Sequence, residues 1–524
     1  MNIKRLIFSA LLLIPLLTRP CTEGLIIGEF THDSRPIHWK LRMWTGTNRL
    51  IFWDNDTNND GIPDTDHDGN GKPDTYAFLG IRSNTNEHPN FLNPMMGLNE
   101  AGFSIGITVV GNVVKGNTNP VMIYPLCHIS SFSEFFNFLK SCPGVYDERN
   151  ETWTIKNNYG VMDAGGKAAE FEYHRSDKTT CKVRVYSATD PVRKNVKYQY
   201  GKNTNMFGIV CRANEFWSDA PTGEYVEGAT AFASAGRFSN AMNNMAALKP
   251  GGVSILKLLQ GDNPQAGNFA HMVLRRSVVS EPDSNCSTMI VQGVLEGENP
   301  LLAVFWAVMG HSDFSVALPV WILGVKNDTD KLPPHCTASA NEKENFAWYA
   351  DNLHKKEKSW QRVQELTLPF ERKIFDEVEN LLMPRWRNAD WNNKKSVEAV
   401  GKQMNRYQNQ TAADAFTLIR FLYRPHSEKL QMAGITYRIE SAQVQALLCS
   451  NKPIASAKSI DGRKLVLNKP WLQYNKIQVN YGDGSLATES LQHTYAQAGT
   501  FLVSVSITTT LGIGISGWVW VDVL

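Results

Sequence analysis

The stretch from Cys21 to Trp44, CTEGLIIGEFTHDSRPIHWKLRMW, decides the fold assignment, and its first residue is the candidate catalytic group. A thiolate is a strong nucleophile, but a thiol needs a base to become one. If the chain is cleaved before Cys21, the new α-amino group can accept the thiol proton, because the pKa of such amines is about 7.7–8.0. One residue would then supply both nucleophile and base. The alternative is a buried or disulfide-bonded cysteine.

Residues 1–20, which precede this stretch, have the pattern of a secretory signal peptide. Lys4 and Arg5 are followed by an apolar run of twelve residues, Leu6 to Leu17. As a helix this run spans about 18 Å, too short for a bilayer core of about 30 Å. We therefore expect a secreted or periplasmic protein with no transmembrane span in the mature chain. The alternative is an uncleaved N-terminal anchor.

The residue before Cys21 is Pro20, and this disfavours both lipidation and ordinary signal-peptidase cleavage. Self-cleavage or another protease is then expected to expose Cys21.

The composition is that of a globular protein: 42% of the 524 residues are hydrophobic and 20% are charged. This length predicts two to four domains. A formal net charge of +2 argues against a nucleic-acid partner. The eight cysteines contain no CxxC pair, which excludes a zinc ribbon.

Changes of pattern along the chain predict four regions. They are a signal peptide (1–20), a strand-rich domain (21–345), a helical extension (346–450) and a small β domain (451–524). Alternating residues predict strands at 103–110, 182–187 and 501–507. A helical period from Phe370 to Leu382 places Phe370, Ile374, Val378 and Leu381 on one face.

An aspartate-rich insert at 54–74, DNDTNNDGIPDTDHDGNGKPD, repeats a short unit of alternating Asp and Asn with a Gly turn. Calcium prefers several such oxygen ligands. The candidate ligands are Asp54, Asp56, Asn58, Asp60, Asp64, Asp66, Asp68 and Asp74. The insert resembles the calcium repeats of thrombospondin type 3, so we expect a structural calcium site. The alternative is a solvated acidic loop.

Six motifs occur in order between Cys21 and Trp321. They are the opening Cys21-Thr22 with Trp39-Lys40, then Gly97 to Phe103, Asn158 to Tyr173, Arg212-Ala213-Asn214, Gly236-Arg237-Phe238 and Pro319-Val320-Trp321. Together they resemble the N-terminal-nucleophile family of penicillin acyltransferases and choloylglycine hydrolases. The resemblance covers about 300 residues.

This resemblance implies an α+β fold in four layers, αββα, with two antiparallel sheets between helices. It also implies hydrolysis or acyl transfer at a C–N amide bond of an acylated small molecule through an acyl-cysteine at Cys21, without a catalytic cofactor. By position, Asn214 would help to hold the oxyanion, and Arg237 and Lys40 would support the site as charges. Asn99, in the Gly97 to Phe103 motif, is interpreted as a turn former.

Two departures from the family favour a second hypothesis. After Trp39-Lys40 the family usually has Asn and, two residues later, Asp, whereas this chain has Leu41 and Met43. The family's Asp contacts the amino group of the nucleophile, and a Met side chain cannot replace it. The alternative function is a catalytically inactive protein of the same fold that serves as a secreted or surface binding module.

The C-terminal region resembles a PKD domain, which is an immunoglobulin-like β-sandwich. The resemblance lies in Val479 to Ser485 and His493 to Gly499, followed by an alternating strand. Such modules act as spacers or attachment modules, so we expect contact with a cell surface, polysaccharide or protein here. Asp483 and His493 are interpreted as turn and packing residues.

Overall fold

The structure is a computed structural model. It describes residues 21–43, 48–53, 75–83, 94–109, 120–142, 146–147, 152–153, 155–175, 181–191, 206–213, 241–242, 245, 250–260, 285–326, 332–333, 335–336, 345–356, 360–423, 437–439, 464–466, 474–497, 499–509 and 514–523.

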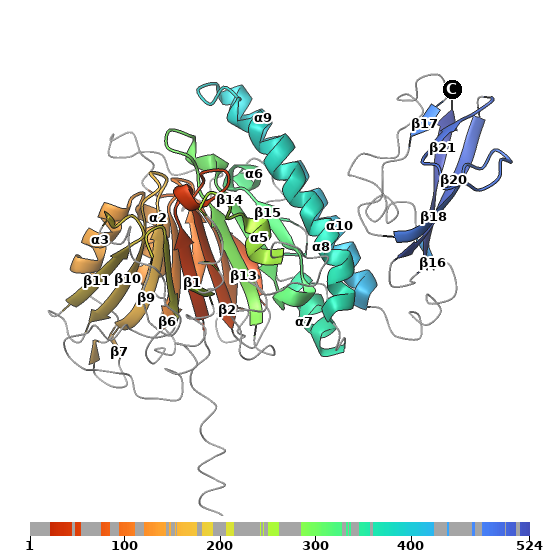
Figure 1. Cartoon of the computed structure of the whole chain (residues 1–524). Helices are drawn as coiled ribbons and strands as arrows, with labels where there is room; N and C mark the ends of the chain where they lie inside the picture. The colour runs from red at the N-terminus through yellow and green to blue at the C-terminus, as the bar shows by residue number, and fades with distance from the viewer. Residues whose placement is uncertain are drawn as a thin grey trace, which may run out of the picture.

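Two antiparallel sheets form the centre of the molecule (Figure 1). The first has six strands in the order β12-β1-β2-β13-β14-β15. Its strands are β1 (Cys21–Ile26), β2 (Ile37–Met43), β12 (Ile209–Ala213), β13 (Asn285–Gln292), β14 (Val304–Met309) and β15 (Ala317–Val320). The second has seven strands in the order β11-β10-β9-β6-β5-β4-β3. Its strands are β3 (Asn48–Trp53), β4 (Phe78–Ser83), β5 (Met96–Asn99), β6 (Ser104–Val109), β9 (Ile155–Met162), β10 (Ala168–Arg175) and β11 (Cys181–Ser187).

Helices α2 (Pro120–His128) and α3 (Phe132–Ser141) cover the outer face of the seven-stranded sheet. The alternation of β6 explains this packing, because Phe103, Ile105 and Ile107 join the apolar cluster with these helices. The intervening residues of β6 face the other sheet. The N-terminus of α3 is fixed by a capping box between Ser131 and Glu134.

A second set of helices covers the outer face of the six-stranded sheet (Figure 1). It contains α5 (Ile255–Gln260), α6 (Ile322–Lys326), α7 (Phe346–Lys356), α8 (Trp360–Glu377), α9 (Met383–Arg387) and α10 (Lys394–Tyr423). Short 3-10 helices lie at η1 (Gly28–Phe30), η6 (Pro300–Leu302) and η7 (Ser312–Phe314). The α+β fold in four layers that the resemblance implies is therefore confirmed. Among the described residues, none of the helices is both long enough and apolar enough to cross a membrane.

Buried side chains tie the helices after residue 345 to the strand domain. The Glu371 carboxylate accepts hydrogen bonds from the backbone N–H of Ala317 and from Gln260, both at 2.8 Å. On α10, Gln408 accepts from the backbone N–H of Trp321 at 3.0 Å, and Asn405 donates to the Gly324 carbonyl at 2.8 Å. The boundary at 345 stays a prediction, but these helices share the core of the strand domain.

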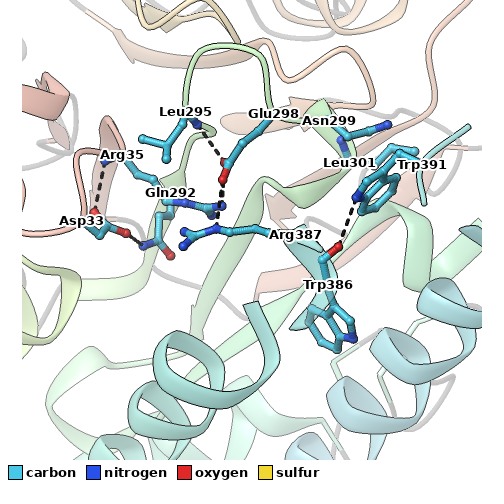
Figure 2. Close-up of polar contacts among 10 residues, drawn as sticks. All are labelled: Asp33, Arg35, Gln292, Leu295, Glu298, Asn299, Leu301, Trp386, Arg387 and Trp391. Carbon is cyan, nitrogen blue, oxygen red and sulfur yellow. Dashed lines mark hydrogen bonds and ion pairs between the residues drawn. The ribbon is translucent and has the colours of Figure 1, made fainter. Parts of the chain in front are cut away.

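Two arginines on one carboxylate anchor α9 at the end of the sandwich (Figure 2). The buried Arg35 contacts Glu298 at 2.7 Å, and Arg387 of α9 contacts the other oxygen of Glu298 at 2.9 Å. Burial and the nearby Arg387 charge lower the pKa of Arg35 to about 10. Asp33, which accepts from Gln292 at 2.7 Å, provides a second negative charge. The cluster is therefore balanced and has a structural role.

The strand predictions are confirmed by β6, β11 and β20 (Gly499–Thr509). The expected helical face is correct for Phe370, Ile374 and Val378, which are buried. It is wrong for Leu381, which is 65% exposed. A π-helical turn, η9 (Val378–Leu382), interrupts the helix, and its extra residue per turn rotates Leu381 away from the buried face.

The C-terminal region forms a small sheet of its own, in the order β16-β21-β20-β18. Its strands are β16 (Tyr437–Ile439), β18 (Tyr474–Asn480), β20 and β21 (Gly514–Val523). A two-stranded sheet joins β17 (Lys464–Val466) and β19 (Gln492–Thr494). Another pairs β7 (Tyr146–Asp147) with β8 (Thr152–Trp153). His493 contacts Asp483 at 2.6 Å and stacks on Tyr481, so both act in packing as expected.

Candidate active site

Cys21 is the first residue of β1; it is reduced, and the residue is 8% exposed. In the antiparallel pair of β1 and β2, Cys21 lies opposite Arg42 and Glu23 lies opposite Lys40. Side chains alternate between the two faces of a strand, so these four side chains share one face. That face is turned toward the seven-stranded sheet, because Glu23 and His38 contact the position where Gly106 would carry a side chain.

Polar side chains fill this part of the space between the sheets, which we call the interior polar cluster. The six-stranded sheet contributes Glu23, His38, Lys40, Arg42 and Arg212. The seven-stranded sheet contributes Ser104, Thr108, Asn158, Glu170 and Glu172. All ten are buried, although polar groups at such positions cost free energy unless they are paired.

Two glycines of the seven-stranded sheet make room for the cluster. A Cβ atom at Gly160 would lie 2.8 Å from His38 Nε2 and 3.3 Å from Glu170 Oε1. A Cβ atom at Gly106 would collide with Glu23 and lie 3.2 Å from His38 Nε2. The absence of side chains at these two positions therefore allows charged groups of the first sheet to reach the second.

The cations of the cluster have defined partners. Arg42 donates to the side-chain oxygen of Asn48 at 2.8 Å. Lys40 Nζ donates to the backbone carbonyl of Ile107. Arg212 contacts Glu172 at 3.3 Å. These contacts hold each cation in one place between the sheets.

The end of β12 is held by the facing sheet. Thr108 Oγ1 and Asn158 Nδ2 both donate to the backbone carbonyl of Ala213, at 3.2 Å and 2.9 Å. Ala213 pairs with Thr22, the residue after Cys21. Two hydrogen bonds from β6 and β9 thus fix the backbone that leads into Asn214, close to the start of β1.

The interior of the sandwich shifts the pKa values of Glu23 and His38 strongly. Burial raises the pKa of Glu23 to about 7, and the opposing charge of Lys40 only partly offsets the effect. Burial and the nearby Lys40 ammonium lower the pKa of His38 to about 3. His38 is therefore a neutral imidazole, and its Nδ1 shares a hydrogen bond with Ser104 Oγ at 2.9 Å.

The structure places Cys21 and Lys40 in one face of the β1–β2 pair, one cross-strand pair apart. Asn214 and Arg237 lie outside the described residues, as do all the candidate calcium ligands between Asp54 and Asp74. Asn99 is a turn former, as expected, because its Oδ1 accepts from the backbone N–H groups of Ala101 and Phe103. Its Nδ2 donates to the Leu126 carbonyl in the last turn of α2 and to the Ile129 carbonyl just after that helix.

The sequence motifs do not identify Arg42 and Asn48 as residues of the site. The motif spacing predicts that Lys40 is the basic residue beside the nucleophile. In the strand pairing, however, Arg42 lies opposite Cys21. The alternation of IHWKLR, in which His38, Lys40 and Arg42 share a face, is the signal that could have identified Arg42. Leu41, in the place of the family's Asn, belongs to the other face of β2 and packs in the apolar core.

No family model matches the chain, and no curated protein matches it. Among solved structures it is similar to a variant of conjugated bile acid hydrolase from Clostridium perfringens, with 15% identity, 58% of this chain and 92% of that chain covered, and a TM-score of 0.32. It is also similar to a Caenorhabditis elegans ortholog of N-acylethanolamine-hydrolyzing acid amidase, with 9% identity, 52% and 92% coverage, and a TM-score of 0.29. Structural similarities this low carry no conclusion about the activity of this chain. Any proposal about its activity must rest on its own residues.

Proposed function

We propose that the protein is an N-terminal-nucleophile amide hydrolase in which Cys21 is the nucleophile. The observation that carries the proposal is the pairing of Cys21 with Arg42 at the first position of β1. A guanidinium on the same strand face can offset the negative charge that forms when the cysteine attacks an amide carbonyl. Arg42 is itself oriented by Asn48, so its charge stays at this place in the fold.

The reaction that we propose begins when the α-amino group of Cys21, released by cleavage after Pro20, accepts the thiol proton. The thiolate adds to the carbonyl carbon of an acylated small molecule, and the amide side chain of Asn214 stabilises the oxyanion. Collapse of this intermediate breaks the C–N bond, and the ammonium proton passes to the leaving amine. Water then hydrolyses the thioester, so that the products are a carboxylic acid and an amine, with transfer to another amine as the variant outcome.

Thr108 and Asn158 support this assignment through the backbone. By holding the Ala213 carbonyl from the opposite sheet, they fix the residue that precedes Asn214. An oxyanion donor stabilises the transition state only when it is preorganised. In the proposed enzyme Arg237 and Lys40 supply further positive charge, and no cofactor takes part in catalysis.

The remaining regions are proposed to serve location and stability. Residues 1–20 direct secretion to the periplasm or exterior, the insert at 54–74 binds structural calcium, and the PKD-like region at 451–524 attaches the protein to a surface, polysaccharide or protein. The partners are thus an amide substrate and an attachment target, without nucleic acid.

A second candidate function is an inactive binding module that retains the fold. The burial of Cys21, together with Met43 in the place of the family's Asp, favours this alternative. A nucleophile must reach its substrate, and a residue that is only 8% exposed needs some local opening to do so.

The test is a panel of N-acyl amino acids, β-lactams, bile-salt conjugates and lipid amides, with release of the amine measured for the mature protein. Cys21→Ala is the matched control, because it removes only the sulfur. Amine release by the wild-type chain and none by Cys21→Ala is the expected result. Equal rates for the two proteins would contradict a role for Cys21, and no turnover of any class would favour the binding module.

A further inference from the structure

Two carboxyl groups from opposite sheets meet inside the interior polar cluster. Glu23 comes from β1 and Glu170 from β10. Both lie next to the Cβ position of Gly160, with Glu170 Oε1 3.3 Å and Glu23 Cδ 3.4 Å from that point. Both side chains are fully buried. Within the described part of the chain neither oxygen of Glu170 has a hydrogen-bond partner, whereas the Glu23 carboxyl faces the Gly160 backbone and the Thr108 side chain. Two carboxylates so placed repel each other in a medium of low polarity.

The charges around this pair do not balance two carboxylates. Arg212 contacts Glu172 at 3.3 Å and its charge also acts on Glu23 and Glu170, whereas Arg42 lies at the Cys21 end of the strand pair with Asn48. Lys40 lies opposite Glu23 in the strand pair. Among the described residues, Lys40 and Arg212 thus face three carboxyl groups, those of Glu23, Glu170 and Glu172, which leaves one negative charge in excess. A buried uncompensated charge is strongly destabilising, so a proton is the simplest group to remove it.

We propose that Glu23 and Glu170 hold one proton between them, and that this shared proton keeps the two sheets closed beneath Cys21. One carboxyl group is then neutral and can donate, and the other is ionised and balances Lys40. The pair belongs to one titrating unit rather than to two independent acids. The inference concerns the folded chain itself and does not require the proposed hydrolase activity.

The directions of the pKa shifts agree with a proton shared by Glu23 and Glu170. Burial raises the pKa of Glu23 and that of Glu170, and for Glu170 the Glu23 charge is the next cause. Besides this pair, the titratable or charged groups that face the cluster among the described residues are Cys21 on β1, His38, Lys40 and Arg42 on β2, Arg212 on β12, Glu172 on β10 and Tyr186 on β11. Cys211 lies on the other face of β12, in the apolar core. Burial keeps His38 neutral and raises the pKa of the Cys211 thiol, so neither adds charge near neutrality.

The raised pKa values of Glu23 and Glu170 make the folding stability depend on pH. A carboxyl group whose pKa is higher in the folded state takes up a proton on folding. The stabilisation is fully present below the unfolded-state pKa of about 4.3, and it is lost as the pH rises through the folded-state pKa of about 7. Across this interval the folding equilibrium constant falls by up to roughly tenfold per pH unit.

Infrared difference spectroscopy of the whole chain tests the proposal, because a protonated carboxyl group has its own carbonyl stretch. We expect a protonated-carboxyl band in the wild-type protein at about pH 6 that is lost by about pH 8.5. Glu23→Gln and Glu170→Gln should each abolish this band alone, since the remaining carboxylate then pairs with Lys40. Glu296→Gln, at an exposed position, is the control and should leave the band intact.

Each other outcome overturns the proposal. A wild-type spectrum without the band means that both carboxyl groups are ionised. A band that survives in either single variant means that the proton belongs to one residue and is not shared. If a variant fails to fold, the wild-type pH titration still decides whether a protonated carboxyl group exists, and the slope of wild-type folding stability between about pH 5 and pH 7 decides whether one proton is taken up on folding. Neither readout uses catalysis, so an inactive protein can still confirm the shared proton.

Discussion

Arg42 lies directly opposite Cys21 in the antiparallel pair of β1 and β2, and its guanidinium is oriented by Asn48. This relationship gives the candidate nucleophile a fixed neighbouring cation. It also places the pair at the end of a space between two sheets that is lined by charged groups.

Replacing Arg42 with Met should slow amine release by the mature protein by roughly tenfold, or about 1.4 kcal/mol. The physical reason is that the guanidinium offsets the negative charge that develops when Cys21 attacks the amide carbonyl. The measurement is the rate of amine release from the best substrate of the panel. Arg406→Met, at an exposed position on α10, is the control. An unchanged rate in Arg42→Met would show that this cation does not assist the attack by Cys21.

Thr108 and Asn158 should be energetically coupled, because both donate to the Ala213 carbonyl. Thr108→Val and Asn158→Ala should each lower the free energy of unfolding by about 1 kcal/mol. The double variant should differ from the sum of the two by about 0.5 kcal/mol or more. Denaturant unfolding of the four proteins measures this coupling, and strict additivity would mean that the two hydrogen bonds act independently.

Gly160→Ala should destabilise the fold by about 1–3 kcal/mol, since the new methyl group would meet His38 and Glu170 between the sheets. Gly165→Ala, in a turn where the Cβ atom meets only Asp163 at 3.3 Å, is the matched control. The midpoint of denaturant unfolding should fall clearly in the first variant and little in the second. Similar losses in both would show that the space beside Gly160 is not needed.

Glu371→Ala should lower the free energy of unfolding by about 1.5–3 kcal/mol, because the backbone N–H of Ala317 and the Gln260 amide both lose a buried acceptor. Glu398→Ala on α10 serves as the comparison. The result would establish that the helices after residue 345 stabilise the strand domain. If Glu371→Ala unfolds at the wild-type midpoint, the helical layer folds as a separate unit.

Calcium removal should lower the thermal unfolding midpoint if the insert at 54–74 binds the ion, because a ligand of the folded state stabilises it by mass action. Addition of a chelator and calorimetric titration with calcium measure the effect. Asp56→Asn combined with Asp60→Asn should reduce the heat of binding. A thermal unfolding midpoint that changes with neither chelator nor calcium would favour the solvated-loop alternative.

Much of the fold could be predicted from local sequence pattern. The alternation of FSIGITVV places Ile105 and Ile107 under the helices and Ser104 and Thr108 inside, as β6 shows. The apolar spacing predicts the wrong face for Leu381, because a π-helical turn leaves no signature in that spacing. Packing against the neighbouring elements, rather than period, decides such a turn.

Less of the candidate site than of the fold could be predicted from the sequence. Cys21 and Lys40 stand in recognisable motifs, whereas the partner of Cys21 depends on strand register, which the connection between β1 and β2 sets. Glu170 and Arg212 reach Glu23 from strands far along the chain, through pairings that only the folded topology reveals. A run of alternating charges in an otherwise buried strand, as in His38, Lys40 and Arg42, was the best available signal.

The most direct test of the nucleophile assignment is the intact mass and N-terminal sequence of the secreted protein, before and after treatment with a thiol reagent. The proposed function predicts a mature chain that begins at Cys21, with one reagent adduct on that N-terminal peptide. A chain that retains Pro20, or that begins elsewhere and carries its adduct on another cysteine, would leave no α-amino base at Cys21 and would contradict the proposed mechanism.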